Sequence, residues 1–145
     1  MADSVQERKI QAAVLKLKSL GLFARVGRGK PIAQSIPGES RPAAFIVRLD
    51  ADRVTPAQPE TDVQWLRFGV LIFGKETDFE KQDAELVLLE AEVYRLLENQ
   101  NLGDLGFNAH WFHTYSPQVN QNMPLDSTMP AFETKLGHSR GNPFE

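Results

Sequence analysis

Cysteine is missing from this 145-residue sequence, and histidine and tryptophan are scarce, with three and two copies. The lack of cysteine excludes disulfide bonds and thiolate metal sites, and it fits a cytosolic product. Residues 1–21 carry charges every few positions and so lack the apolar segment of a signal peptide. No later apolar run is long enough to span a membrane, so we expect no membrane partner.

Motifs for catalysis and cofactor binding are missing as well. The glycines of GRGK, residues 27–30, are separated by one residue, and Pro31 follows the lysine, whereas a phosphate-binding loop needs four residues there and a Ser or Thr after the lysine. His110 and His113 are three residues apart on an expected strand, which places them on opposite faces, so zinc is not expected. No serine lies in a G-x-S-x-G turn. We predict no catalytic, cofactor or metal site and no enzyme activity.

The composition is that of an ordinary globular domain, with 41% hydrophobic and 24% charged residues. Its net charge of -3 conceals an asymmetry, because residues 1–59 hold ten Lys/Arg and five Asp/Glu, whereas residues 60–145 hold six and fourteen. Two interpretations remain open. Each charged region is a solvated face, or surfaces of opposite sign meet between copies of the chain.

Two helices are predicted from capping signals and apolar spacing. Ser4 and Glu7 fit a capping box, apolar residues recur at helical spacing after it, and Gly21 suits the end of a helix over 4–20. A second capping box with Thr77 at the N-cap and Glu80 three residues later starts a helix that runs to about residue 99. Its acidic side is interpreted as solvated. Its apolar stripe consists of Ala84, Leu86, Leu89, Val93, Leu96 and Leu97, with Val87 and Tyr94 at the margin.

Five strands are expected, over residues 22–28, 43–50, 62–74, 108–116 and 131–136. The segment 27–42 is rich in Gly, Pro and Ser and is predicted to be a long loop. We expect a single α+β domain over residues 1–136, with a mostly antiparallel four- to five-stranded sheet and two helices packed on one face. Residues 137–145 hold too few apolar side chains to pack alone and are expected to form a C-terminal arm, with Phe144 as its contact residue.

The strand DVQWLRFGVLIFGK, residues 62–75, is apolar on both faces. Leu66, Phe68, Val70 and Ile72 alternate with a second set: Val63, Trp65, Arg67, Gly69, Leu71 and Phe73. Two helices on one side leave the second set bare, and a bare apolar patch of this size marks an interface. We therefore expect another copy of the chain, or the long loops, to cover it. The predicted interface residues are Trp65, Arg67, Leu71 and Phe73.

Positive charge is concentrated around the strands 22–28 and 43–50. The residues are Arg25, Arg28, Lys30, Arg41, Arg48 and Arg53. A basic patch attracts phosphates, but the pI of about 5.6 and the lack of a helix-turn-helix, zinc or RNA-binding signature argue against sequence-specific nucleic-acid binding. Nonspecific contact with passing DNA is compatible with this pattern.

The order of elements resembles the tail terminator, or tail-tube capping, family of long-tailed bacteriophages. The features that carry the likeness are the helix QERKIQAAVLKLKSLG, the Pro-led strand RPAAFIVRLD, the long strand QWLRFGVLIFGK, the helix DAELVLLEAEVYRLL and the closing strands HWFHTYS and AFETKL. The likeness covers residues 5 to 137 and lies in element order and pattern rather than in a diagnostic motif.

This resemblance implies a structural virion protein of the tail and neck, made in the host cytoplasm. It implies a homohexameric ring that caps the tail tube, stops its polymerisation and joins a head-side neck protein. Arg25, Arg28, Lys30, Arg48 and Arg53 are then expected to face the DNA channel or a partner. The alternatives are another neck or minor tail component, such as a head-tail connector, or a small nucleic-acid-binding protein.

Overall fold

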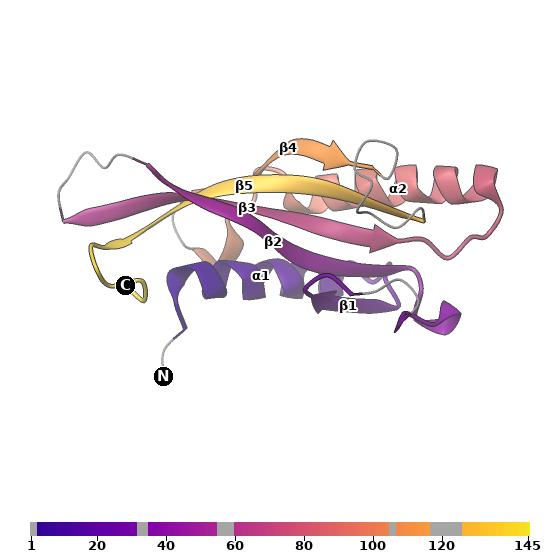
Figure 1. Ribbon diagram of the computed structural model, residues 1–145, viewed down its shortest axis with the longest axis horizontal. Coiled ribbons are helices and arrows are strands. Elements are labelled where there is room, and N and C mark those ends of the chain that lie inside the picture. The colour runs from indigo at the N-terminus through magenta and orange to yellow at the C-terminus, as the bar shows by residue number, and fades with distance from the viewer. Residues whose placement is uncertain (1–2, 32–34, 55–59, 105–106, 117–125) are drawn as a thin grey trace.

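The computed structural model describes residues 3–31, 35–54, 60–104, 107–116 and 126–145 (Figure 1). The elements, in chain order, are α1 (Val5–Leu20), β1 (Arg25–Arg28), η2 (Gly38–Ser40), β2 (Ala43–Val54), β3 (Thr61–Phe73), α2 (Phe79–Leu97), η3 (Leu102–Asp104), β4 (His110–Tyr115) and β5 (Ser127–Ser139). The chain therefore has the predicted α+β fold, with two helices and five strands among the described residues.

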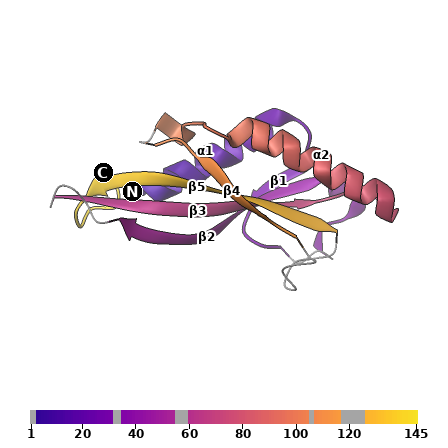
Figure 2. The same ribbon diagram turned by 90° about the horizontal axis from the view of Figure 1, so that it is seen from above.

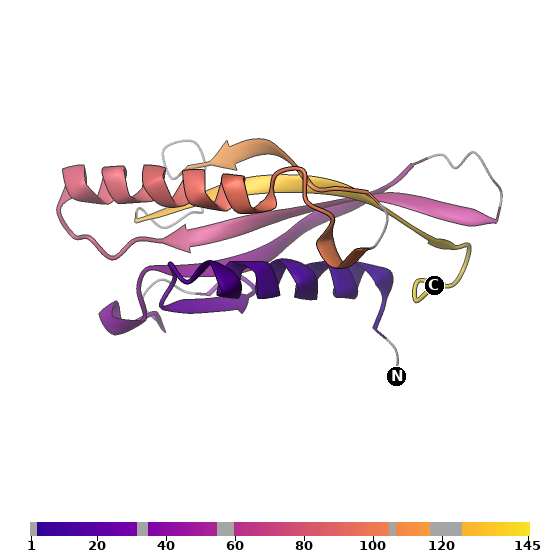
Figure 3. The same ribbon diagram turned by 180° about the vertical axis from the view of Figure 1, so that it is seen from behind.

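The five strands form one sheet in the order β1-β2-β3-β5-β4. Only β1 and β2 are parallel, and the other three pairs are antiparallel. The central strand β3 pairs with β2 on one side and with β5 on the other, while β1 and β4 form the two edges (Figure 1). Both helices lie on the same face of this sheet, as predicted (Figures 2 and 3).

Local signals set the helix ends. The Ser4 hydroxyl oxygen accepts a hydrogen bond from the Glu7 N–H at 3.1 Å, and Gly21 adopts a φ of 73° just after α1. The second helix begins one residue later than expected, because the Asp78 carboxylate, rather than Thr77, accepts from the Lys81 N–H. An aspartate is at least as good an N-cap as a threonine, so the local chemistry favours this start.

The last strand is much longer than predicted, at Ser127–Ser139 instead of 131–136. It pairs with β3 from Ser127↔Phe73 to Ser139↔Thr61, and this long partner is what extends it. Pro130 therefore lies inside a strand and not in a loop. Beyond β5, the Arg140 N–H donates to the Glu60 carbonyl at 2.8 Å, and the Val5 N–H donates to the Pro143 carbonyl at 2.9 Å. The expected arm thus folds back onto its own α1.

The main core lies between the helices and the sheet. Leu66, Phe68, Val70 and Ile72 of β3 pack here, as predicted, against apolar side chains of α1 and α2. The rings of Phe68 and Phe132 stack in this core with their centroids 5.8 Å apart. Each fully buried aromatic side chain of this kind contributes about 1.5–3 kcal/mol through the hydrophobic effect.

Candidate assembly surfaces

The second face of β3 is partly covered by the chain itself. Leu71 and Phe73 are 1% and 0% exposed and belong to a second apolar cluster. Its buried members are Ile36, Ala43, Phe45, Leu71, Phe73 and Met129. The prediction that Leu71 and Phe73 form a subunit interface is therefore wrong, because both side chains are already inside their own subunit. Ile36, from the expected loop 27–42, supplies part of the cover. This agrees with the second possibility considered from the sequence, in which the long loops cover this face.

Arg41 closes this second cluster from the side. Its guanidinium carbon lies 5.4 Å from the centroid of the Phe73 ring, and it forms an ion pair with Asp126. It also donates to the carbonyl oxygens of Ile36 at 3.3 Å and Gly74 at 3.2 Å. This one side chain ties together three segments that are distant in sequence.

The other half of the second face carries charge. The Arg67 guanidinium contacts Asp52 at 2.7 Å, Asp50 at 2.9 Å and Glu133 at 3.3 Å. These hydrogen bonds, with that of Asp52 the largest contribution, raise the pKa of Arg67 above its ordinary value. Arg67 was predicted to contact another subunit, but its donors are occupied by carboxylates of its own chain.

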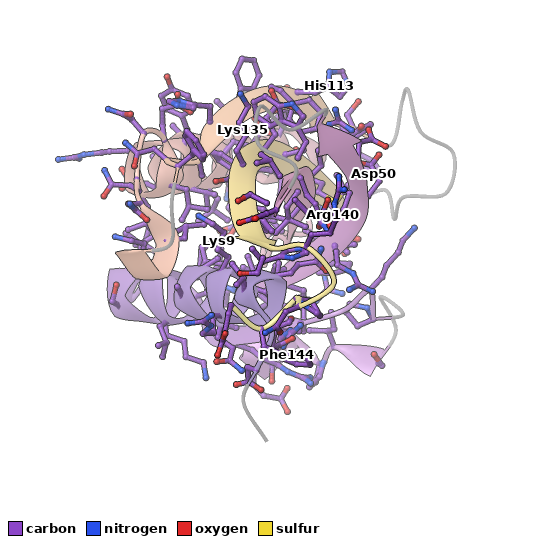
Figure 4. The ribbon with its side chains drawn as sticks, turned by 90° about the vertical axis from the view of Figure 1, so that its left-hand side faces the viewer. Lys9, Asp50, His113, Lys135, Arg140 and Phe144 are labelled. Carbon is purple, nitrogen blue, oxygen red and sulfur yellow. The ribbon has the colours of Figure 1, made fainter. Side chains whose placement is uncertain are left out.

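A bulge in β2 explains this cluster. From the sequence, period-two alternation places Asp50 on the same face as Arg48, and the structure overturns this expectation. The register shifts between Arg48 and Asp50, so that Arg48 lies opposite Phe68 while Asp50 lies opposite Arg67. One extra residue moves everything after it to the other face. Figure 4 shows Asp50 on the outer strand of this end of the sheet.

Trp65 keeps part of its surface in contact with solvent, next to Lys135. The Lys135 ammonium lies 4.8 Å from the centroid of the Trp65 ring and 5.7 Å from that of Phe107. Both distances suit cation–π attraction. A shallow pocket at this point is lined by Trp65, Phe107, Asn108, His110 and Lys135. Trp65 is thus the one predicted interface residue that offers an apolar surface.

The predicted basic cluster is divided between the two faces. Arg28 forms an ion pair with Glu7 of α1, which lowers the pKa of Glu7, and Arg48 donates to the Gln6 amide oxygen at 2.8 Å. Arg25 is on the opposite face, with its guanidinium carbon 5.4 Å from the centroid of the Phe45 ring. Lys30 is exposed after β1. The side chain of Arg53 lies outside the described part of the chain.

A second bulge, in β4 between Trp111 and His113, changes the faces expected there. Trp111 pairs with Phe132 and meets Tyr94 of α2, with ring centroids 6.3 Å apart, while His113 and Tyr115 contact each other on the far face. Period-two alternation along the sequence places Trp111, His113 and Tyr115 on one face, and the bulge makes this expectation wrong. His110 and His113 lie opposite Glu133 and Ala131, which share a face, so the expected separation of the two histidines is also wrong.

This bulge creates a groove between α2 and β4 that sequence reasoning missed. Its lining consists of Val87, Glu90, Ala91, Tyr94, Trp111, Thr114 and Pro130. Val87, Tyr94 and Trp111 are 58%, 47% and 45% exposed. The sequence held one signal for it, since Val87 and Tyr94 are seven residues apart at the margin of the apolar stripe of α2.

Lys9 is the other residue that sequence reasoning missed. It is 1% exposed and lies between α1 and β5 (Figure 4), where its ammonium donates to the Phe107 carbonyl at 3.1 Å and to the Thr134 hydroxyl at 3.4 Å. Burial without a carboxylate partner among the described residues lowers the pKa of Lys9 to about 8. Lys9 fixes Phe107 beside Trp65 and Lys135, so it positions the pocket on the other side of the sheet.

Phe144 contacts the chain's own first helix through its backbone. Its carbonyl oxygen accepts from the Arg8 guanidinium at 2.9 Å, while its ring is 41% exposed (Figure 4).

The described residues contain no cluster of three or more metal-ligating side chains. Neither of the described helices is long and apolar enough to cross a membrane. No known protein family and no curated protein matches the sequence of this chain.

Proposed function

We propose that this chain is a structural subunit of a bacteriophage tail, a terminator that forms a ring with copies of itself and caps the tail tube. The ring stops polymerisation of the tube and joins the tail to a head-side neck protein. Its expected place is the virion, at the junction of tail and neck.

The observation that carries this proposal is the open outer edge of the sheet. β1 pairs only with Ala43–Ile46 of the twelve-residue β2, so Val47–Val54 has no neighbouring strand on that side among the described residues. β2, β3 and β5 extend together beyond α2 and the edge strands (Figure 1). Unpaired backbone donors and acceptors along such an edge are a template for pairing with another chain.

The side chains along this edge favour a specific partner over indiscriminate pairing. Arg48, Asp50 and Asp52 are exposed there. Charged residues on an edge strand oppose aggregation, so a partner must carry complementary charges to pair with it. The partly exposed Trp65 on the same part of the sheet adds an aromatic contact of the kind that is enriched at interfaces.

The proposal is tested with purified protein and purified tail tubes. Native mass spectrometry is expected to give a closed oligomer, with six copies as the family resemblance implies, and electron microscopy is expected to show rings at one end of each tube. Tubes that elongate in its presence as they do in its absence, together with a strictly monomeric chain, would contradict the proposal. Binding to a head-side component but never to tubes would favour a different neck protein.

A further inference from the structure

The two edges of the sheet differ in charge. Residues 5–30, which form α1 and β1, hold seven Lys/Arg and one Asp/Glu, whereas residues 79–115, which form α2 and β4, hold two Lys/Arg and seven Asp/Glu. Because β1 and β4 are the two ends of the strand order, these regions lie on opposite flanks of the molecule (Figure 1). We call them the basic flank and the acidic flank.

The acidic flank has a preformed groove. The Trp111 indole N–H donates to the Thr114 hydroxyl at 2.9 Å, and the Trp111 backbone N–H donates to the Glu98 carboxylate at 2.6 Å. The polar atoms of Trp111 are therefore satisfied within the chain, and what the groove exposes is the apolar surface of Trp111, Tyr94 and Val87. Apolar surface that remains exposed next to a rigid aromatic pair is typical of an interface anchor site.

The described part of the chain provides no Lys or Arg partner for the carboxylates around the groove. Glu90 accepts from the Thr128 hydroxyl, and Glu98 contacts His110 at 3.1 Å. Among the described residues no Lys or Arg forms an ion pair with Glu90, Glu92 or Glu98. Aromatic rings beside carboxylates attract a Lys or Arg side chain through both cation–π and ionic interactions.

The basic flank offers the matching features. Leu15 and Leu22 are 65% and 42% exposed, each with an exposed cation three residues later, Lys18 and Arg25, and Lys30 is exposed after β1. No described carboxylate is within ion-pair distance of Lys16, Lys18 or Lys30. Within the described residues, the flank thus combines apolar side chains with lysines that have no ion-pair partner, and the groove combines apolar side chains with carboxylates that have no Lys or Arg partner.

We propose that the groove between α2 and β4 receives the basic flank of a second copy of this chain. The contact is head-to-tail, because each copy uses two different surfaces, and repetition of such a contact closes a ring or grows a filament. This inference rests on the proposed self-assembly and adds a second pair of surfaces to the open edge of β2.

The test uses three variants of the full chain, each checked for folding by circular dichroism. Val87→Glu places a carboxylate in the groove. Leu88→Glu is the matched control, since Leu88 is 60% exposed on the same helix but does not line the groove. The double variant L22E/K30E replaces one exposed apolar side chain and one lysine of the basic flank with carboxylates. We expect Val87→Glu and L22E/K30E each to weaken self-association, measured by analytical ultracentrifugation, by about tenfold or more, as for loss of an interface anchor, and Leu88→Glu to leave it unchanged.

Mixing the variants tests the direction of the contact. A groove-blocked copy keeps its basic flank and a flank-blocked copy keeps its groove, so a 1:1 mixture of Val87→Glu and L22E/K30E is expected to associate more strongly than either variant alone. Val87→Glu that assembles like the wild type, or a mixture that stays monomeric, overturns the groove contact. If wild-type rings persist in Val87→Glu, only this inference fails, whereas a wild type that is monomeric at every concentration overturns the proposed function as well.

Discussion

The sulfur of Met129 occupies the space that a Cβ atom on Gly69 would need, with a separation of only 2.6 Å. Glycine in the middle of the central strand therefore lets Met129, from β5, lie flat on the second face. Met129 is itself buried and belongs to the cluster with Leu71 and Phe73. This close approach is one reason why that face is covered from within the subunit.

Substitution of Gly69 by alanine is expected to destabilise the fold by about 1–3 kcal/mol, because the added methyl group overpacks the space that Met129 fills. Gly137→Ala is the matched control, since Gly137 also lies in a strand but its Cβ would meet its nearest neighbour at 3.7 Å. Urea unfolding of both variants measures the difference. Equal unfolding midpoints for the two would mean that Met129 moves aside at little cost.

An aspartate is expected to have different effects on the two faces of β3. Phe68→Asp is expected to prevent folding, because Phe68 is 1% exposed between the helices and the sheet. Trp65→Asp is expected to leave a folded chain that fails to assemble, since Trp65 keeps part of its surface in solvent and rests against Lys135. Circular dichroism reports folding, and sizing chromatography reports assembly. A Trp65→Asp variant that is as unfolded as Phe68→Asp would place Trp65 in the monomer core.

Lys9 is expected to make the free energy of unfolding change with pH in the alkaline range. Its pKa is about 8 in the folded chain, below the ordinary value of 10.5, so between these values the unfolded chain binds more protons than the folded one. Stability attributable to Lys9 therefore rises as pH increases from about 8 to 10.5, and the cost of its burial is fully present below pH 8.

Lys9→Met removes this dependence. The difference in unfolding free energy between wild type and Lys9→Met is expected to shift in favour of the wild type by on the order of 3 kcal/mol between pH 7 and pH 11. Denaturant titrations at several pH values measure it, and Lys18→Met, at an exposed position of the same helix, is the control for the loss of a lysine as such. A difference for Lys9→Met that does not change with pH would show that Lys9 keeps an ordinary pKa in the folded chain.

Arg67 forms ion pairs with three carboxylates on a partly exposed surface. Arg67→Gln leaves Asp50, Asp52 and Glu133 to repel one another and is expected to cost about 1 kcal/mol at neutral pH and low salt, since exposed ion pairs are worth little individually but form a network here. The cost should shrink at high salt, which screens the repulsion between the carboxylates. Thermal unfolding across salt concentrations checks this, and a cost that is independent of salt would mean that packing, not charge, is lost.

Much of the fold was predictable from short-range patterns. Ser4 and Gly21 bound α1 as expected, and the helix-facing residues of β3, such as Leu66 and Phe68, are in the main core because period-two alternation over a long uninterrupted strand leaves little freedom. The number of helices and strands and their order follow from the same local signals.

The tertiary structure alone decided which surfaces remain open. The bulges before Asp50 and His113 exchange faces through a single extra residue, and no local pattern marks where such a residue is inserted. The burial of Leu71 and Phe73 depends on the side chains of Ile36 and Met129, and that of Lys9 on the backbone carbonyl of Phe107. Only the folded chain brings these distant segments together. The sequence by itself determined the elements and their apolar stripes, because those depend on neighbouring residues. The long-range packing decided which stripes are covered and which are left for a partner.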